Sequence, residues 1–460
     1  MDITTLTQLT NALQQIVGAE HVSSADSDRN LHAKDQSSHA AHLPDLVVWP
    51  ETTAQVSQIA RLANENQVAI TGWGAGSSLE GNTIPLRGGI VIDFGRMNRI
   101  VAVHQNDFQV TVQPGIFYKD MNKTLAQYGL FFAPDPGANA SVGGMVANNA
   151  AGTRTVRYGA TRDNIMALEV VLANGEVIRT GSRSVKQSAG YDLTHLFTGS
   201  EGTLGLITEA TLKLHPLPEH FSAVVAAFDS TPAAAEAVYG IIGSGLNPAA
   251  LELLDADSVR YMNTLDSVDL PERPLLLMEF HGASAATITA ELELVRQVCD
   301  DCGCTYFEAG VGRDERDRLW EGRHKLGEIL FRIYPDSIYL ITDVAVPISQ
   351  YPVLAAYTNS LFDELHVKGA LFGHAGDGNL HTVAFGRKDD AAQQAVLQTF
   401  NDRVVQKALA LGGTCTGEHG VGIGKQKYMV YEHGEGAIAV MSSIKRLFDP
   451  NNILNPGKVV

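Results

Sequence analysis

The chain has 460 residues, of which 45% are hydrophobic and 18% charged, as is typical of a globular protein with two or three domains. Its net charge of −17, without a local basic patch, disfavours nucleic acid and anionic lipid as partners. No apolar run approaches the length of a transmembrane segment, which excludes a membrane-spanning protein as well.

The N-terminal residues predict an amphipathic helix, because apolar side chains recur at steps of three and four residues. They are Ile3, Leu6, Leu9, Leu13 and Ile16. The first basic residue is Arg29, so this segment has neither the cationic start of a secretory signal nor the Arg-rich face of a mitochondrial presequence. We therefore expect a cytoplasmic protein.

A short apolar strand at residues 45–50 precedes a helix that Thr52 or Thr53 can cap. The inner face of this helix carries Val56, Ile59, Ala60 and Ala63. A second strand, residues 68–71, leads into a Gly-rich loop at 72–82. Alternate glycines let backbone N–H groups converge, which suits a pyrophosphate, although Gly/Ser loops are more often plain turns.

A second Gly-rich stretch, residues 134–152, follows a helix expected around 118–128. Its small side chains, Pro and Asn leave only backbone to pack, which is typical where a large planar or phosphorylated ligand lies close. Arg154, Arg157 and Tyr158 follow at once and could anchor a phosphate or a carboxylate.

The Asn174-Gly175 turn between apolar runs predicts a β-hairpin. A third Gly-rich loop, residues 199–205, enters a strand that ends near Pro216. No Gly-x-Gly-x-x-Gly opens a helix after a strand, and no Lys-Ser/Thr follows a Gly loop. A Rossmann dinucleotide site and a P-loop are therefore both disfavoured.

The order of these motifs resembles the FAD domain of the vanillyl-alcohol-oxidase (PCMH-type) flavoproteins. The resemblance implies that the first loop wraps the pyrophosphate through Gly74, Ala75, Gly76, Ser77, Ser78 and Asn82. It implies that the rest of FAD is lined by Pro134, Gly143, Gly144, Asn148, Gly152, Tyr158, Glu201, Gly202 and Ile207. Some members attach FAD through a His or Cys near the first loop. Residues 72–82 contain neither, so we expect noncovalent FAD.

From about residue 221 the pattern changes to alternating strands and helices. Strands at 223–228 and 275–280, each followed by a helix, predict an antiparallel sheet covered by helices, a ferredoxin-like cap. Three of the four cysteines lie close together at Cys299, Cys302 and Cys304. They lack a fourth ligand at a useful spacing, which disfavours a structural zinc and leaves their role open.

Residues 313–330 predict a helix with Trp320 and Arg323 on one face. Strands at 338–344 and 369–373 flank a helix at 349–365, and the second strand delivers the chain to His374. Further helices are expected at 391–411 and 438–448.

Two motifs carry residue types that bind metals. His374 and His381, with Glu418, supply two imidazoles and a carboxylate, which are a ligand set for a divalent ion. Gly376 and Gly378 give the backbone the freedom to fold back, so both rings could reach one ion. On residue type alone, ordinary turn and core histidines are an equal alternative.

The second half is similar to the C-terminal domain of FAD-linked oxidases in its His-x-Gly-Asp-Gly-Asn-Leu-His run, its Glu-His-Gly triplet and its Asp-Pro…Asn-Pro-Gly-Lys tail. The resemblance spans essentially the whole chain and points to FAD-dependent D-2-hydroxy-acid dehydrogenases. It implies that His374, His381 and Glu418 bind the metal and that His419 is the catalytic base. Zinc or manganese is expected, and iron and cobalt suit the same ligands.

In the implied reaction, hydride moves from C2 of the hydroxy acid to flavin N5 and His419 takes the hydroxyl proton, which a divalent ion makes more acidic. Arg323 would pair with the substrate carboxylate. The alternative is that the histidines are buried turn residues, Glu418 a surface acid and Arg323 half of a salt bridge. Asp377 and Asn379 are interpreted as turn and supporting groups, and Trp320 as packing.

Dehydrogenases of D-2-hydroxyglutarate carry a Thr, a Lys and an Asn where this chain has Gly327, Ile341 and Val383. The groups for a second carboxylate are missing, which favours D-lactate over glycolate and D-2-hydroxyglutarate. The expected electron acceptor is a cytochrome, a quinone or an electron-transfer flavoprotein, which could hold the protein at a membrane peripherally. Oxygen and a homodimer are left open.

The expected fold class is α+β, with a two-subdomain FAD domain at residues 1–219 (core about 42–219), a cap with the metal site at 220–435, and a C-terminal segment, 436–460, that returns to the FAD domain. Two other functions are weighed. A metal-dependent hydrolase would not need three flavin-type loops, and a non-catalytic flavin subunit of an electron-transfer complex would not reduce its flavin with a hydroxy acid.

Overall fold

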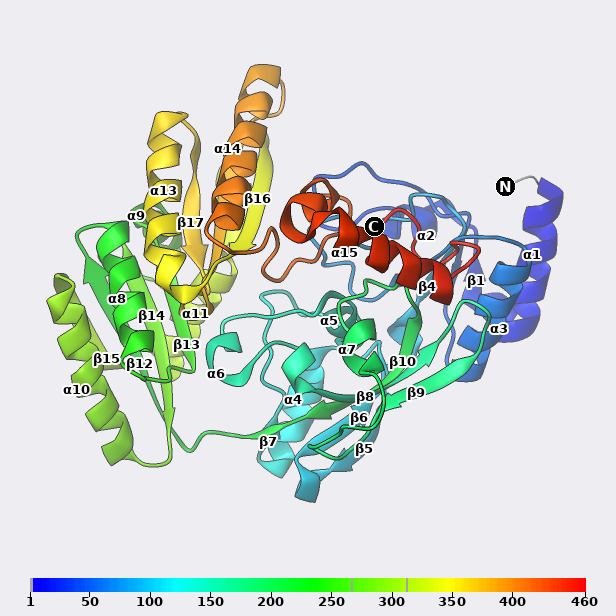
Figure 1. Cartoon of the computed structure of the whole chain (residues 1–460), viewed down its shortest axis with the longest axis horizontal. Coiled ribbons are helices and arrows are strands. Elements are labelled where there is room, and N and C mark those ends of the chain that lie inside the picture. Colours follow the sequence, from blue (N-terminus) through cyan, green and yellow to red (C-terminus); the bar gives the residue numbers. More distant parts are fainter. Residues whose placement is uncertain (1–2, 266–267, 312) are drawn as a thin grey trace. The chain divides into compact units, whose positions relative to one another are not determined.

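The computed structural model describes residues 3–265, 268–311 and 313–460, which form two compact units (Figure 1). The first unit comprises Met1–Ala151, Ala160–Leu217 and Glu418–Val460, and the second comprises Gly152–Gly159 and Pro218–Gly417. Among the described residues, no helix has both the length and the apolar character needed to cross a bilayer.

The first unit contains a four-stranded sheet of order β1-β2-β4-β3, in which β2 and β3 run parallel to β4. Its strands are β1 (Val22–Ser23), β2 (Leu46–Val48), β3 (Ile70–Trp73) and β4 (Ile90–Asp93). Helices α1 (Ile3–Val17) and α3 (Thr53–Glu65) pack on it. The predicted inner face of α3 is buried. Of the two predicted caps, Thr52 is the one that caps the helix, in a reciprocal bond with Gln55.

The same unit contains a five-stranded antiparallel sheet of order β5-β6-β10-β8-β9. Its strands are β5 (Ile100–His104), β6 (Gln109–Val112), β8 (Ile165–Val171), β9 (Val177–Gly181) and β10 (Leu206–Lys213). A small pair joins β7 (Leu130–Phe131) to β11 (His215–Pro216). The predicted hairpin is confirmed, because β8 and β9 pair across a turn in which Gly175 has φ 82°.

Helices of the first unit show two departures from the predictions. Within the second Gly-rich stretch lies α5 (Val142–Asn148), which buries Val142, Met145 and Val146, so the prediction that only backbone packs there is wrong. The final helix α15 (Gln426–Phe448) begins earlier than predicted and continues across a non-helical Gly434. The remaining helices of four residues or more are α2 (Asp26–Leu31), α4 (Tyr118–Leu125) and α7 (Leu193–Phe197).

The C-terminal tail joins the first unit as an added edge beside β3. Ile70 bonds Ile453 and Asn455 through its backbone, at 2.7 Å in each case. Buried Asp449 accepts hydrogen bonds from the backbone N–H groups of residues 453 and 454. Lys458 is also buried and donates to the Ile84 carbonyl at 2.6 Å, so the polar groups of the tail are satisfied inside the unit.

The second unit is built on a seven-stranded antiparallel sheet of order β15-β12-β14-β13-β17-β18-β16. Its strands are β12 (His220–Phe228), β13 (Ala250–Leu254), β14 (Leu275–Gly282), β15 (Cys304–Val311), β16 (Ser337–Ala345), β17 (Lys368–Gly373) and β18 (Asn379–Arg387). In chain order the first four lie as 4-1-3-2, so the predicted ferredoxin-like arrangement is confirmed.

Helices flank this sheet, and most of them join its strands. They are α6 (Thr155–Tyr158), α8 (Thr231–Gly243), α9 (Ala256–Met262), α10 (Ala285–Asp301), α11 (Arg313–His324), α12 (Leu326–Ile333), α13 (Tyr351–Glu364) and α14 (Ala391–Ala410). The single helix predicted at 313–330 is two helices, because Lys325 leaves helical geometry at ψ 3°. Trp320 is buried in the apolar cluster of this unit, which confirms it as a packing residue.

Strand register places several polar residues on one face of the seven-stranded sheet. His381 pairs with Asp343 on one side and with Phe372 on the other. Phe372 pairs in turn with Leu254, two residues from Glu252. Because paired residues share a face and every second residue repeats it, Asp343, His381 and Glu252 point the same way.

Candidate active site

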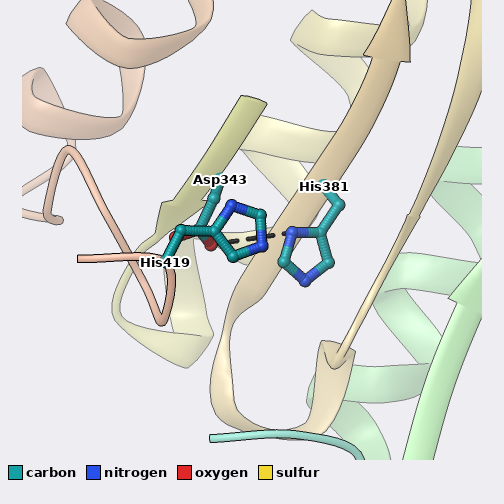
Figure 2. Close-up of side chains that lie close together, drawn as sticks. All are labelled: Asp343, His381 and His419. Carbon is teal, nitrogen blue, oxygen red and sulfur yellow. Dashed lines mark ion pairs between the residues drawn. The ribbon is translucent and has the colours of Figure 1, made fainter. Parts of the chain in front are cut away.

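Strands β16 and β18 hold Asp343 beside His381. Both side chains are buried, and Asp343 Oδ1 lies 3.6 Å from His381 Nδ1 (Figure 2). The same carboxylate accepts hydrogen bonds from Asn379 Nδ2 at 2.7 Å and from Thr416 Oγ1 at 3.0 Å. Asp343 therefore orients the start of β18, at Asn379, and the loop that leads to Gly417. Asn379 was predicted to support the site in this way.

A tight turn brings His374 to His381. His374 follows β17, and the chain reverses over Ala375–Asp377 before β18 begins. Gly378 has φ 84°, and a Cβ there would lie 2.1 Å from the Val346 carbonyl oxygen, so only glycine fits. The two imidazole centroids are 5.2 Å apart, and one nitrogen of each ring lies within 4.8 Å of the other. The expected return of the chain at the glycines is confirmed.

A residue that the sequence analysis did not single out connects His374 to Arg323. Glu252 on β13 is fully buried, with Oε1 2.6 Å from His374 Nδ1 and Oε2 2.7 Å from Arg323 Nη2. Burial raises the pKa of this carboxyl, but the charges of His374 and Arg323 outweigh it and hold the pKa below its ordinary value. An ionised carboxylate only accepts hydrogen bonds, so Nδ1 of His374 is the donor in this contact.

Arg323 is buried on α11, with only 6% of its surface exposed. Its guanidinium lies over the Phe372 ring, 4.5 Å from the centroid. Its Nε–H has no hydrogen-bond partner in the described part of the chain. Buried donors are rarely left in that state, so this atom is available to an anionic ligand.

A second buried charge cluster lies on the adjacent strand, β14. Glu279 receives a hydrogen bond from His281 Nε2 at 2.5 Å, and Arg316 Nη1 lies 3.5 Å away. Burial works against ionisation, but His281 and nearby arginines lower the pKa of Glu279 to about 2. Tyr158, predicted to line FAD, bonds the other nitrogen of His281 at 2.7 Å through its hydroxyl. This bond holds Tyr158 and its segment, Gly152–Gly159, within the second unit.

The first unit brings its Gly-rich loops together. A Cβ at Gly74 would lie 2.1 Å from Ser141 Oγ, and one at Gly143 would lie 2.5 Å from Pro114 Cβ, so these glycines allow close packing of loop on loop. At Gly137 and Gly202, by contrast, no described atom lies within 4 Å of such a Cβ. The space beside Gly137 and Gly202 would let a large cofactor lie against the backbone of these loops.

Three predicted cofactor residues also hold the loop that begins at His419. Asn82 Nδ2 donates to Glu201 at 2.7 Å and lies 3.4 Å from the His419 carbonyl, which Asn148 Nδ2 approaches at 3.5 Å. Glu201 accepts the N–H groups of residues 421 and 422 at 2.6 and 2.9 Å. Burial raises the pKa of Glu201 in spite of these bonds.

The other predicted cofactor residues lie at four places in the chain. Gly74, Ala75, Gly76, Ser77 and Ser78 follow β3, Pro134, Gly143 and Gly144 lie before and in α5, Gly152 precedes α6, and Gly202 and Ile207 lie at β10. The Ser78 hydroxyl donates a hydrogen bond to Asp35 Oδ2 at 2.9 Å. Glu418 and His419 follow Gly417 directly and count with the first unit.

Family models match most of the chain. Residues 217–459 match the C-terminal domain of FAD-linked oxidases, and residues 44–181 match an FAD binding domain. The chain belongs to the FAD-linked oxidases. Its place among the flavoprotein oxidoreductases, predicted from the Gly-rich loops and the histidine motif, is thereby confirmed.

Named relatives of this FAD-linked oxidase include two enzymes of hydroxy-acid metabolism. It is 40% identical over 435 residues to the mitochondrial D-lactate dehydrogenase (cytochrome) of Arabidopsis thaliana, covering 94% of this chain and 76% of that one. It is 37% identical over 454 residues to glycolate oxidase subunit GlcD of Bacillus subtilis, covering 97% and 95%.

The fold of this FAD-linked oxidase has solved counterparts. The 4-ethylphenol oxidase of Gulosibacter chungangensis superposes with a TM-score of 0.80 at 18% identity, covering 100% of this chain and 97% of that one. At this identity the likeness speaks for the fold alone. It confirms the predicted α+β class with a PCMH-type FAD domain.

The burial of Glu252 could have been inferred from the sequence of this oxidase. It stands between Leu251 and Leu253 in a strand that is otherwise apolar, and a carboxylate in such a strand is buried and must find a cation or donors. Glu279 occupies a similar position in the apolar run of β14. Both acids could have been predicted as buried partners, although their counterparts could not be named.

Proposed function

We propose that this FAD-linked oxidase converts a small D-2-hydroxy acid, D-lactate above all, to the 2-oxo acid. The observation that carries the proposal is the Arg323–Glu252–His374 connection on the sheet face that also bears His381. This connection places the buried Arg323, whose Nε–H has no hydrogen-bond partner among the described residues, close to the imidazoles of His374 and His381. A carboxylate next to a hydroxyl is the ligand that such a pair of features suits. The names of the relatives agree with it.

The metal ligands in this proposal are His374, His381 and Glu418. One nitrogen of each imidazole lies within 4.8 Å of the other, and Glu252 orients the His374 ring through Nδ1. A Cβ at Gly417 would lie 2.9 Å from Asp343 Oδ1, so the chain passes against the buried carboxylate before it continues into Glu418. Two neutral nitrogens and a carboxylate oxygen suit zinc or manganese.

When bound, FAD supplies the hydride acceptor and the divalent ion lowers the pKa of the substrate hydroxyl. His419 accepts the hydroxyl proton, since a neutral imidazole nitrogen is a proton acceptor. Asn82 and Asn148 donate hydrogen bonds to the backbone carbonyl of His419 and so restrict its position. Arg323 binds the substrate carboxylate and thereby fixes the position of C2.

The preference for a short substrate follows from the side chains next to His381. Ile341 pairs with Val383, two residues along β16 and β18 from Asp343 and His381, and both join the apolar cluster. The sheet face therefore becomes apolar directly beyond the candidate ligands. A methyl group is accommodated there at less cost than a second carboxylate, which would be buried without a partner.

Anaerobic mixing of the purified protein with D-lactate, L-lactate, glycolate and D-2-hydroxyglutarate tests the proposal. We expect the flavin absorbance to bleach fastest with D-lactate and not with L-lactate, and the rate to fall when a chelator has removed the metal. A yellow protein that no D-2-hydroxy acid bleaches would refute the proposal and favour a non-catalytic flavin subunit. A colourless metalloprotein would favour a hydrolase, and fastest bleaching by glycolate would move the substrate to that acid.

We further propose that the FAD is noncovalent. Acid precipitation is expected to leave all of the flavin in the supernatant, because residues 72–82 contain no His or Cys. The structure does bring His39 to this loop, where its Cδ2 would lie 3.1 Å from a Cβ at Gly81. Flavin retained in the pellet would contradict the proposal, and its release in His39→Ala would then identify the attachment.

Electrons would leave to a redox partner. A cytochrome is our first candidate, because the Arabidopsis relative carries that word in its name, and a quinone or an electron-transfer flavoprotein is the alternative. A cytoplasmic location and a homodimer remain predictions.

A further inference from the structure

Glu252 touches both a candidate metal ligand and the candidate substrate-binding arginine. It is fully buried on β13, and its two oxygens face different partners, His374 at 2.6 Å and Arg323 at 2.7 Å. These partners come from separate elements, the turn after β17 and helix α11. A single side chain therefore fixes the relative positions of an imidazole and a guanidinium.

Each of the two contacts has a distinct chemical consequence. As an acceptor at Nδ1, Glu252 fixes the orientation of the His374 ring and raises the basicity of Nε2, the atom proposed to bind an ion. As the counter-charge of Arg323, it offsets the cost of burying a guanidinium and leaves Nε–H unused. Phe372 stacks on the guanidinium and restricts its movement further.

We infer that Glu252 is a positioning residue that couples metal binding to recognition of the substrate carboxylate. The inference rests on the proposed function, since it assumes an ion at His374 and a carboxylate at Arg323. Glu252 touches neither of them. It acts by holding His374 Nε2 and Arg323 Nε–H in fixed directions, so the substrate hydroxyl and carboxylate are bound at a set separation.

The chain offers a matched control on the neighbouring strand. Glu279 is also buried and also lies between a histidine, His281 at 2.5 Å, and an arginine, Arg316 at 3.5 Å. Its partners are not candidate ligands. Replacing Glu279 with Gln thus removes a buried charge of the same kind without disturbing His374, and separates a loss of positioning from a general loosening of the unit.

The test is Zn²⁺ affinity, measured on the FAD-loaded protein by competition with a chromophoric chelator and without substrate. We expect Glu252→Gln to weaken Zn²⁺ binding about 10- to 100-fold, as removal of such partners does elsewhere. Glu252→Asp, which keeps the charge but is one methylene shorter, should fall between Gln and the parent. Glu279→Gln should bind Zn²⁺ as the parent does. With saturating Zn²⁺, Glu252→Gln should still raise the KM for D-lactate.

Each outcome decides the question. Unchanged Zn²⁺ affinity in both Glu252 variants overturns the inference and leaves the proposed function intact. An equal loss in Glu279→Gln also overturns it, since the effect would then be structural. A parent protein that binds no Zn²⁺, Mn²⁺ or Co²⁺ overturns the proposed metal site and this inference together. If Glu252→Gln does not fold, the affinity of Glu252→Asp decides alone.

Discussion

Replacing His381 with alanine is expected to lower kcat/KM for D-lactate by about a thousandfold or more, with the FAD still bound. A divalent ion bound at the proposed site would contribute several kcal/mol to the reaction, and each ~1.4 kcal/mol is a factor of ten in rate. His381 is buried beside Asp343, and alanine removes one of the three proposed ligands without supplying another. Stopped-flow reduction of the flavin measures the effect directly.

The control for this variant is Thr382→Val on the same strand. Thr382 is paired with Thr342 and Leu371, on the face opposite His381, and its hydroxyl has no hydrogen-bond partner among the residues that the structure describes. This nearly isosteric change should leave both flavin reduction and bound metal as in the parent. Rapid, chelator-insensitive reduction in His381→Ala would show that the reaction does not use an ion held by this histidine.

Replacing Arg323 with lysine is expected to raise the KM for D-lactate about 10- to 100-fold. Hydrogen bonds to charged groups are worth about 1.5–3 kcal/mol, and a lysine keeps the charge but loses the planar fork that binds a carboxylate at two points. Lysine is preferred to alanine because alanine would leave Glu252 buried without its cation, which by itself costs about 3–5 kcal/mol of stability.

Arg316→Lys provides the comparison for Arg323→Lys. Arg316 lies seven residues earlier on the same helix and pairs with Glu279 instead of Glu252. Arg316→Lys should change the thermal stability about as little as Arg323→Lys does, and it should leave the KM for D-lactate unaltered. Zn²⁺ affinity should stay normal in both variants, because the Glu252–His374 contact remains. An unaltered KM in Arg323→Lys would mean that this arginine serves only the buried ion pair.

Local rules predicted the features that a few neighbouring residues decide. The Thr52–Gln55 cap follows from short-range hydrogen bonding and the hairpin at Asn174-Gly175 from turn sterics, and both are present. The return of the chain at Gly378 is of the same kind, since a positive φ of 84° requires glycine. The same rules placed the start of α15 too late, because Gly434 and Gly436 interrupt the apolar periodicity of this helix.

The sequence alone thus determined the flavin-type loops, the two histidines on either side of a tight turn and the general order of strands and helices. It could not determine what Glu252 touches, because its partner His374 lies 122 residues further along the chain. That contact exists only because β13 pairs with β17 while α11 covers the same face. Burial then forces the carboxylate to take both a donor and a cation, and only the tertiary structure decided that these are His374 and Arg323.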